Sequence, residues 1–480
     1  MIHFGTGGWR AVIGEEYTKE NLEKLSLALA YMIKDAHLEN DPVVIGYDRR
    51  FLSKESAVWV SAVLASQSLH VRFINHSVPT PAVMYYMKEH HLSYGLMITA
   101  SHNPAVYNGV KVFVKGGRDA GVEVTSGIEG YLEKAEENWR DHENEHGQMP
   151  TDRYLKLKAA GLIDEIDPID EYIDGIIRDI DMDAIRKRKP YIAADPMHGV
   201  SLQSLNTILT IARCRIDAIN TEHDALFGGL MPSPSSATIR RLQTYVLDNG
   251  CDMGVATDGD ADRLGVIDDR GRFLHANDIL VMVYYYFLKY KGIRGPAVRN
   301  LATTVRLDRL AEKYGQKCYE VPVGFKYISA AMAEHHAVIG GESSGGIAVQ
   351  GRTNGKDGIF SACLLVEMTA VTGKNLSELA REVQEEIGMT HVEERDYRFP
   401  AESREMLKEM IRTFDYAASM PKQVDRVEEP DGVKVYFRDD SWLSIRFSGT
   451  EPVLRIFCET EEKEDAVQMC EIMEKYLNLK

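Results

Sequence analysis

The sequence is poor in cysteine and tryptophan, with six and four of these residues among 480. The six cysteines are scattered and form no Cys-X-X-Cys pair, so neither a disulfide framework nor a zinc knuckle is indicated. A reducing, cytoplasmic location fits this pattern. The longest apolar run, ILVMVYYYFL from Ile279, is about half as long as a bilayer requires and predicts a buried core helix.

The sequence also lacks a long basic run. Its 56 basic and 73 acidic residues give a formal net charge of −17, which disfavours binding to nucleic-acid phosphates. The N-terminus MIHFGTGGWR has no basic region followed by an apolar one, as a secretory signal would have. We therefore expect neither a nucleic acid nor a membrane as a partner.

The order of predicted elements recurs three times, over residues 43–114, 191–267 and 298–349. In each stretch, short runs rich in β-branched residues alternate with helix-like segments, which predicts parallel α/β sheets. The last connection in each stretch is shorter than a parallel crossover requires, so the last strand should run antiparallel. Charged stretches at 137–148 and 392–399 are predicted to be structureless junctions.

Beyond the second junction, VKVYF, WLSIRF and VLRIF predict strands, and a helix is expected from about Glu462. These elements predict a smaller α+β domain after three α/β domains. The predicted domains are residues 1–150 with the loop TASHNP, 151–273 with DGDADR, 274–390 with GGESSGG, and 391–480 with RFSGTEP.

The motif DGDADR places carboxylates at three alternate positions, Asp258, Asp260 and Asp262. In a tight loop they can converge on one hard cation, because Mg²⁺ and Ca²⁺ prefer oxygen ligands. An EF-hand calcium loop would need Gly and Glu where this sequence has Arg263 and Asp269. Mg²⁺ that shares its sites with water and a phosphate is therefore the better match, and a solvated acidic turn is the alternative.

The motif RFSGTEPVLR gathers two guanidinium groups and two hydroxyls around a glycine. Such groups bind a phosphate dianion through charge-assisted hydrogen bonds and exposed backbone amides. The predicted phosphate-binding side chains are those of Arg446, Ser448, Thr450 and Arg455. FGTGGWR, near the N-terminus, likewise combines a glycine-rich backbone with Arg10.

The motif GGESSGG offers an acid and two hydroxyls, at Glu342, Ser343 and Ser344, on a glycine-rich backbone. Lys326 and Lys356 are candidate neighbours of this loop. An acid and hydroxyls suit the hydroxyl groups of a sugar. A simple linker is the alternative interpretation.

TASHNP places Ser101 between a predicted strand and a turn-forming Asn-Pro pair. A phosphoserine carries about −1.5 to −2 charge and three acceptor oxygens, so it could share Mg²⁺ with the aspartates. Lys111 could transfer protons or neutralise charge, and His102 could orient the loop or only stabilise the turn. A GxSxG elbow is absent, which disfavours a Ser-His-Asp hydrolase and leaves phosphoryl transfer.

The motifs TASHNP, DGDADR, GESSG and RFSGTEP, in this order and one per predicted domain, resemble those of the α-D-phosphohexomutase superfamily. The resemblance to these phosphoglucomutase and phosphomannomutase enzymes covers nearly the whole chain. It implies three related mixed-sheet α/β domains and a C-terminal α+β domain, similar to the TATA-binding protein, around a central cleft. It also implies a reversible isomerase that moves a phosphoryl group between the 1- and 6-positions of a hexose phosphate through a 1,6-bisphosphate.

The same resemblance implies residue roles. Ser101 would carry the phosphoryl group and would bind Mg²⁺ with the three aspartates, and glucose 1,6-bisphosphate would be the activator. Arg10 and Lys111 would assist the transfer, and Glu342 and Ser344 would hold sugar hydroxyls. The phosphate that is not reacting would be held by Arg446, Ser448, Gly449, Thr450 and Arg455.

The choice of sugar depends on two departures. Some phosphomannomutase relatives have histidine where this sequence has Gly346, and Phe325-Lys326 looks more like phosphoglucomutase relatives. Glucose is therefore favoured over mannose, and glucosamine and pentose phosphates remain alternatives. A metal-dependent sugar phosphatase or a non-catalytic sugar-phosphate sensor would be a rival function. A small-molecule sugar phosphate is the predicted partner, and the sequence predicts no oligomeric state.

Overall fold

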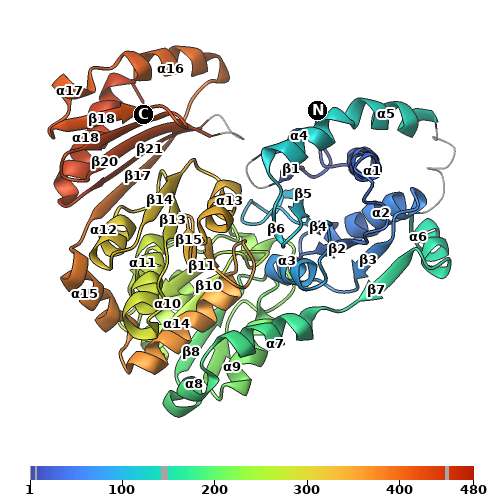
Figure 1. Cartoon of the computed structure of the whole chain (residues 1–480), viewed down its shortest axis with the longest axis horizontal. Helices are drawn as coiled ribbons and strands as arrows, with labels where there is room; N and C mark the ends of the chain where they lie inside the picture. Colours follow the sequence, from blue (N-terminus) through green and yellow to red (C-terminus); the bar gives the residue numbers. More distant parts are fainter. Residues whose placement is uncertain (1, 6–7, 142–149, 449–452, 480) are drawn as a thin grey trace. The chain divides into compact units, whose positions relative to one another are not determined.

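A computed structural model of the chain describes residues 2–5, 8–141, 150–448 and 453–479. Two compact units result, the first formed by residues 1–279 and 344–379 and the second by residues 280–343 and 380–480. The first unit contains two whole sheets of those drawn in Figure 1, and the second contains the C-terminal sheet and strands β13 to β15 of another. Two of the boundaries between the units fall inside α11 (Ala276–Tyr286) and α15 (Leu376–Ile387).

The first sheet lies in the first unit, and its main path runs β1-β5-β4-β2-β3-β7. β2 pairs in parallel with β3 and β4, and the following strand β5 runs antiparallel to β4, which confirms the prediction from the short connection. β1 and β7 extend the sheet beyond the predicted strands. The strands are β1 (Trp9–Val12), β2 (Val43–Tyr47), β3 (Val71–Ile74), β4 (Tyr94–Ile98), β5 (Tyr107–Val114), β6 (Arg118–Asp119) and β7 (Ile163–Ile166).

Both faces of this sheet are covered because its strands are apolar at successive positions. Val43 and Ile45 pack in one core, and Val44 between them packs in another on the opposite face. Helices α1, α2, α4, α5 and α6 lie on the first side, and α3 lies on the second, where α7 packs against it. These helices are α1 (Lys19–Asp35), α2 (Ser53–Ser66), α3 (Thr80–Glu89), α4 (Val122–Gly130), α5 (Leu132–Asp141), α6 (Pro150–Ala159) and α7 (Ile169–Asp179).

The second sheet, also in the first unit, has the order β12-β11-β10-β8-β9. β8 pairs in parallel with β9 and β10, and β11 again runs antiparallel, as predicted. Its strands are β8 (Tyr191–Asp195), β9 (Arg215–Ala218), β10 (Met253–Thr257), β11 (Leu264–Ile267) and β12 (Phe273–Leu274). The other elements of this unit are α8 (Met182–Arg188), α9 (Leu202–Ile211), the 3₁₀ turn Phe227–Gly229, α10 (Arg240–Asn249), β16 (Ile347–Val349) and α14 (Gly358–Thr372).

The second unit opens with a parallel arrangement in which β13 lies between β14 and β15. Its C-terminal sheet is wholly antiparallel, in the order β17-β21-β20-β19-β18. The strands are β13 (Ala297–Asn300), β14 (Cys318–Val321), β15 (Ile339–Gly341), β17 (His391–Arg398), β18 (Val424–Glu428), β19 (Val433–Phe437), β20 (Trp442–Phe447) and β21 (Val453–Thr460). The helices are the π-helical turn Phe287–Lys291, α12 (Arg306–Lys313), α13 (Phe325–His335), the 3₁₀ turn Ala401–Ser403, α16 (Arg404–Thr413), α17 (Tyr416–Ser419) and α18 (Lys463–Tyr476).

Two predicted junctions are wrong where the structure describes them. Residues 137–141 end helix α5, whereas 142–149 lie outside the described residues. Residues 391–398 form strand β17, which pairs with β21 along its whole length. The charges of β17 concealed it, because this edge strand carries ion pairs between half-buried side chains, such as those of Arg395 with Glu393 and Glu474.

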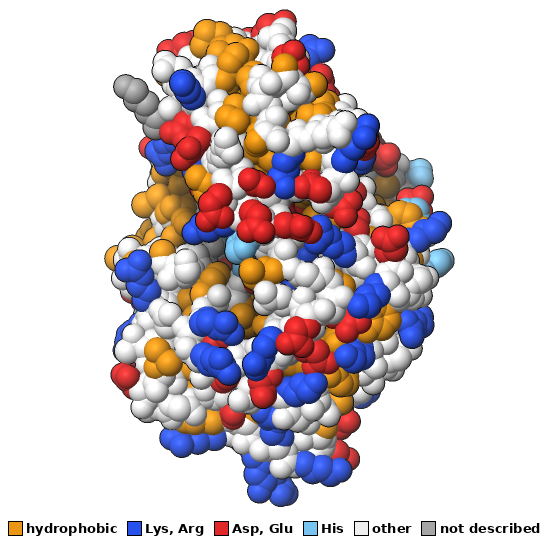
Figure 2. Space-filling model, turned by 90° about the vertical axis from the view of Figure 1, so that its left-hand side faces the viewer, with side chains coloured by type: hydrophobic (Ala, Val, Ile, Leu, Met, Phe, Trp, Pro, Cys, Tyr) orange, Lys and Arg blue, Asp and Glu red, His pale blue; other side chains and the backbone are white. Residues whose placement is uncertain are grey.

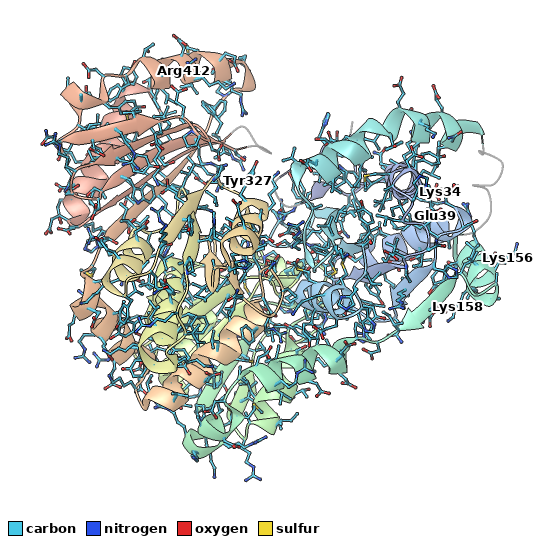
Figure 3. All side chains as sticks on the ribbon, viewed as in Figure 1. Lys34, Glu39, Lys156, Lys158, Tyr327 and Arg412 are labelled. Carbon is cyan, nitrogen blue, oxygen red and sulfur yellow. The ribbon has the colours of Figure 1, made fainter. Side chains whose placement is uncertain are left out.

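The predicted core helix is confirmed, since Leu280 to Leu288 are all at most 3% exposed. Among the described residues no single helix is both long and apolar enough to cross a membrane. Helices α14 and α15 have the required length and hydropathy only when taken together, and the pair is bent by 81°. Long charged side chains such as Lys156 and Arg412 lie at the outside of their units (Figure 3). Acidic and basic side chains are interspersed on the face shown in Figure 2.

The C-terminal sheet is joined to the loop after β13 by one buried carboxylate. Glu459, on β21, is 0% exposed. It accepts hydrogen bonds from the hydroxyls of Thr304 and Thr390, both at 2.5 Å, from the Val305 N–H at 2.9 Å, and from the Trp442 indole at 2.7 Å. Four donors in two parts of the second unit therefore depend on a single side chain.

We expect Glu459→Ala to destabilise the second unit by about 3 kcal/mol, because it leaves several buried donors without an acceptor. The thermal midpoint should fall by about 6–12 °C. Glu461→Ala is the matched control, since that carboxylate is 58% exposed and pairs with Arg309 at the surface. Its effect should stay within about 0.5 kcal/mol. Circular dichroism during heating measures the thermal midpoint of each variant. Equal midpoints for Glu459→Ala and Glu461→Ala would show that Glu459 does not stabilise the second unit.

Candidate active site

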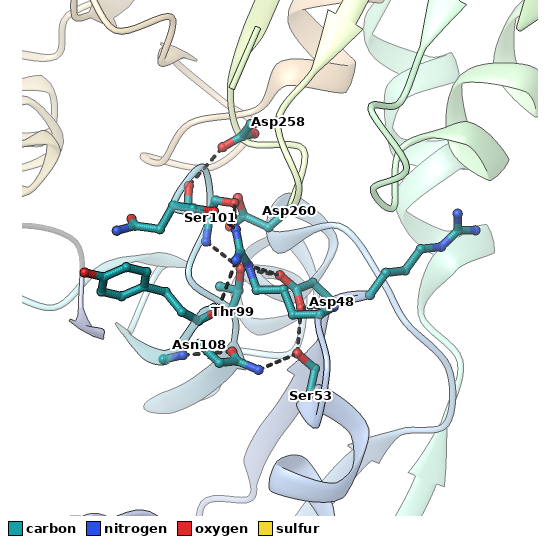
Figure 4. A network of polar contacts seen from close by, with 12 residues as sticks. Asp48, Ser53, Thr99, Ser101, Asn108, Asp258 and Asp260 are labelled. Atoms are coloured by element: carbon teal, nitrogen blue, oxygen red, sulfur yellow. Dashed lines mark hydrogen bonds and ion pairs between the residues drawn. The ribbon is translucent and has the colours of Figure 1, made fainter. Parts of the chain in front are cut away.

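The loops that follow β4 and β10 meet within the first unit. The Ser101 hydroxyl, after β4, donates to Asp258 Oδ2, after β10, at 2.9 Å (Figure 4). Thr80, at the start of α3, donates from its backbone N–H to the Asp260 carbonyl at 2.9 Å and from its hydroxyl to Asp260 Oδ2 at 2.6 Å. A Cβ on Gly259 would lie 2.9 Å from the Ser101 carbonyl oxygen, so glycine permits this approach of the two loops.

Ser101 is fully buried and has a left-handed backbone, with φ of 53°. This conformation costs a non-glycine residue on the order of 1–2 kcal/mol and persists where its surroundings impose it. Here the Thr99 hydroxyl accepts the Ser101 N–H at 2.8 Å. The backbone thus directs the Ser101 hydroxyl at the aspartate loop.

The three aspartates form one group of potential metal ligands. Asp258, Asp260 and Asp262 are at most 1% exposed, and one oxygen of each lies within 4.8 Å of those of the other two. Oδ1 of Asp260 and Oδ1 of Asp262 are buried without a hydrogen-bond partner. Buried, unpartnered carboxylate oxygens carry a large desolvation cost that a hard cation would offset. The residues present therefore fit a divalent cation.

Positive side chains surround the aspartates. The Lys111 ammonium, on β5, lies 2.6 Å from both Asp260 and Asp262, and Lys356 lies 3.2 Å from Asp262. Burial alone would lower the pKa of Lys111, but the two aspartates raise it above its usual value. Lys111 is therefore a fixed positive charge here. Burial, together with Asp260 and Asp262, raises the pKa of Asp258.

Arg10 and His102 belong to the same region. Arg10, on β1, donates from Nη1 to the Asn103 side chain at 2.6 Å. This contact links β1 to the serine loop, residues 99–106 between β4 and β5. His102 is half-buried, and its Nδ1 has no hydrogen-bond partner. Burial and the nearby cations Arg263 and Arg10 hold the pKa of His102 well below its usual value, so the imidazole is neutral at pH 7.

The remaining predicted residues are described in each unit separately. In the second unit Arg446 forms an ion pair with Asp431 at 3.1 Å, and its backbone lies opposite that of Arg455 in the sheet. Ser448 follows β20 and is 6% exposed. The predicted residues Gly449 and Thr450 lie outside the described residues.

The sugar-loop residues also divide between the units. In the second unit Glu342 is 8% exposed and accepts a 3.4 Å hydrogen bond from Asn300, and Lys326 lies over the Tyr327 ring at 5.3 Å. Ser344, like Lys356, belongs to the first unit. Their roles in binding a sugar remain predictions.

The predicted site residues did not include those that support the serine loop, among them Asp48, Arg50 and Thr80. Asp48 and Arg50 follow β2 directly in the run VVIGYDRR. Polar residues just after a parallel strand are a signal for a site, because ligands bind at the carboxyl ends of such strands. β2 lies beside β4, which carries the serine loop, so this signal pointed to the correct edge.

Four family models match the chain, each described as a domain of phosphoglucomutase/phosphomannomutase. Domain I matches residues 1–139, domain II 170–271, domain III 275–387 and the C-terminal domain 391–475. The chain belongs to the phosphoglucomutase/phosphomannomutase family. This membership confirms the resemblance and the predicted fold class, with three α/β domains and a C-terminal domain.

Relatives of known name cover the whole chain. A phosphoglucomutase/phosphomannomutase of Thermococcus kodakarensis is 31% identical over 99% of this chain and 98% of its own. A Pyrococcus abyssi protein named "Probable phosphoglucosamine mutase" is 30% identical over 98% of this chain and 97% of its own. The solved structure of a Thermus thermophilus protein assigned as a phosphomannomutase has a TM-score of 0.84, with 28% identity and 99% of each chain covered.

These relatives establish the reaction class. This family member is a phosphohexomutase, an isomerase that transfers a phosphoryl group within a sugar phosphate. The relatives are named for glucose, mannose and glucosamine phosphates. The glucose preference expected from the sequence therefore stays a prediction, and the glucosamine and mannose alternatives fit these names equally well or better.

We expect Asp260→Asn to weaken Mg²⁺ binding at least roughly tenfold, because it removes one anionic ligand from the aspartate group. Isothermal titration with magnesium chloride measures the affinity. Asp224→Asn is the matched control, since Asp224 lies in an exposed turn and accepts the backbone N–H groups of Leu226 and Gly228. Unchanged affinity in both variants would mean that DGDADR is only an acidic turn.

Proposed function

We propose that Ser101 is the phosphoryl carrier of this phosphohexomutase, in a reversible exchange between the 1- and 6-positions of a hexose phosphate. The observation that carries the proposal is the hydrogen bond from the Ser101 hydroxyl to Asp258, inside the buried aspartate group. A phosphoryl group on that oxygen would lie beside the oxygens of Asp260 and Asp262 that have no hydrogen-bond partner. The serine and the aspartates would then form one site.

The metal expected at this site is Mg²⁺, held by Asp258, Asp260, Asp262 and the phosphoserine. When bound there, Mg²⁺ supplies electrostatic stabilisation of the negative charge on the phosphoryl oxygens. Lys111 holds Asp260 and Asp262 together from the β5 side and neutralises part of their charge. Arg10 orients the serine loop through Asn103 and adds a second fixed positive charge.

The proposed transfer moves phosphoryl groups only between Ser101 and the sugar phosphate. A sugar hydroxyl oxygen attacks the phosphorus of phosphoserine, the bond from phosphorus to Ser101 Oγ breaks, and Oγ takes up a proton as the sugar hydroxyl loses one. The hexose 1,6-bisphosphate that forms then returns its other phosphoryl group to Ser101. A hexose 1,6-bisphosphate, such as glucose 1,6-bisphosphate, therefore activates dephosphorylated enzyme.

The second unit would bind the rest of the substrate. Guanidinium groups bind phosphate in two parallel hydrogen bonds, which suits Arg446 for the phosphate that is not reacting. Its present partner Asp431 keeps the guanidinium placed until a phosphate replaces the carboxylate. The other residues proposed to bind phosphate and sugar are Lys326, Glu342, Ser448, Gly449, Thr450 and Arg455 in the second unit, and Ser344 and Lys356 in the first.

For the sugar we propose glucosamine phosphate first, with glucose and mannose phosphates as the second candidates. Support comes from the name of the Pyrococcus relative, whereas the Thermococcus relative supports glucose and mannose. Assays with the 1-phosphates of all three sugars, under saturating bisphosphate, rank them by kcat/KM. The highest kcat/KM with glucose 1-phosphate would overturn the glucosamine assignment and restore the expectation from the sequence.

We expect Ser101→Ala to lose nearly all mutase activity while it keeps its fold, because the change removes the hydroxyl that donates to Asp258 and would carry the phosphoryl group. The assay supplies the hexose 1,6-bisphosphate and follows sugar 6-phosphate and inorganic phosphate together. Ser61→Ala is the control, as this buried hydroxyl donates to the Ala57 carbonyl within α2 at 2.7 Å. Wild-type turnover by Ser101→Ala would sink the carrier role, and release of inorganic phosphate by the wild type in place of isomerisation would indicate a phosphatase.

We expect Arg446→Ala to slow both directions, from 1-phosphate to 6-phosphate and back, since each phosphate would occupy the same site in turn. The loss of a charge-assisted contact to phosphate should cost on the order of 1.5–3 kcal/mol, or about ten- to a hundredfold in kcat/KM. Arg438→Ala, an exposed arginine after β19, is the control. A defect in one direction alone would remove Arg446 from this role.

A further inference from the structure

One buried guanidinium forms hydrogen bonds with several backbone carbonyls of the serine loop. Arg50, 3% exposed, donates from Nη2 to the carbonyl oxygens of Ser101 and Asn103, each at 2.6 Å. Its Nη1 donates to the carbonyls of Pro104 at 2.9 Å and Tyr107 at 3.1 Å. Three carbonyls of the loop and one at the start of β5 therefore converge on one side chain. The rigid fork of arginine can donate to all four, and the ammonium of lysine, with three donors, cannot.

A second group holds the arginine and the serine together. Asp48, 2% exposed, faces Arg50 with 3.4 Å between Oδ2 and Nε, and it accepts the Arg50 backbone N–H at 2.9 Å. The same carboxylate accepts the hydroxyls of Ser53 at 2.7 Å and Thr99 at 2.6 Å. Because the Thr99 oxygen also accepts the Ser101 N–H, both backbone polar groups of Ser101 end in this network (Figure 4).

The network explains how a left-handed serine is maintained. Four carbonyl dipoles directed at one point repel one another unless a cation lies between them, and here the guanidinium does so out of water. The Phe227 ring covers the guanidinium at 4.9 Å from the side of the second sheet. Burial raises the pKa of Asp48, and Arg50 is the first of the groups that oppose this rise. Burial likewise lowers the pKa of Arg50, and Asp48 is the first group that opposes that fall.

We propose that Arg50, with Asp48 and Thr99, is a positioning residue for phosphoryl transfer, which fixes Ser101 Oγ against the aspartate group without contact to the substrate. This inference rests on the proposed carrier role of Ser101. A displacement of about 1 Å of a reacting group can cost roughly a hundredfold in rate. Loss of the network should therefore lower kcat and the rate of Ser101 phosphorylation, and leave KM for the sugar phosphate unchanged.

The test compares two substitutions with matched controls. Arg50→Lys keeps the charge but cannot bridge four carbonyls, and Arg49→Ala is its control, since the neighbouring guanidinium donates to the Thr221 carbonyl at 3.3 Å, away from the serine loop. Thr99→Val removes the hydroxyl that links Asp48 to Ser101, and Thr99→Ser restores it in nearly the same volume. Thermal unfolding of each variant reports the fold.

The measured quantities are kcat, KM and the rate at which glucose 1,6-bisphosphate phosphorylates Ser101. To obtain that rate, the reaction is quenched at set times and the mass of the intact protein is determined by mass spectrometry. We expect a roughly hundredfold fall in kcat and in phosphorylation rate for Arg50→Lys and Thr99→Val, with wild-type rates for Arg49→Ala and Thr99→Ser. KM should not move. The Thr99 pair decides the matter if Arg50→Lys does not fold.

A wild-type rate of Ser101 phosphorylation in Thr99→Val would overturn the positioning role. A loss of kcat/KM that comes from a raised KM, with kcat unchanged, would also overturn it. An equal loss in Thr99→Ser would do the same, because it would show a requirement for the volume of threonine and not for its hydroxyl. Failure of the carrier role has a different signature. In that case the wild-type protein itself would take up no phosphoryl group on Ser101 from the bisphosphate.

Discussion

The burial of three carboxylates next to a serine is the constraint on which the rest of the first unit's site depends. Like charges at this distance repel one another strongly in a low dielectric. The ammonium groups of Lys111 and Lys356 and the hydroxyls of Thr80 and Ser101 offset this repulsion. Two carboxylate oxygens still remain without a hydrogen-bond partner. A site built in this way favours a bound cation, because a cation would offset the cost of burying these oxygens.

The sheets make this arrangement available. The serine loop follows β4 and the aspartate loop follows β10, and each precedes an antiparallel strand, so the two loops are analogous parts of related sheets. Each also contains a non-glycine residue in the left-handed region, Ser101 and Ala261. Strained backbone at both loops fits a site whose geometry is imposed by the surrounding structure.

The sequence predicted the parts of the site that have their own chemical signature. Asp258, Asp260 and Asp262 could be read as a cation site, and the structure brings their oxygens together. Arg50 could not be assigned, because its partners are backbone carbonyls, which look the same in every sequence. Strand β17 was missed for a similar reason, since its charged side chains pair along an edge of the sheet and hide the alternation of a strand. The sugar was not determined by the motifs: they favoured glucose, whereas the relatives that match the chain are named for glucose, mannose and glucosamine phosphates.

The most direct test of the account follows the phosphoryl group itself. Enzyme carrying a radiolabelled phosphoryl group on Ser101 is mixed with unlabelled sugar 1-phosphate for a single turnover and quenched. If Ser101 is the carrier, we expect the label to leave the protein and appear in the hexose bisphosphate or the 6-phosphate, while the phosphate of the substrate replaces it on Ser101. Label that stays on the protein while product forms, or that appears as inorganic phosphate, would contradict a carrier role for Ser101.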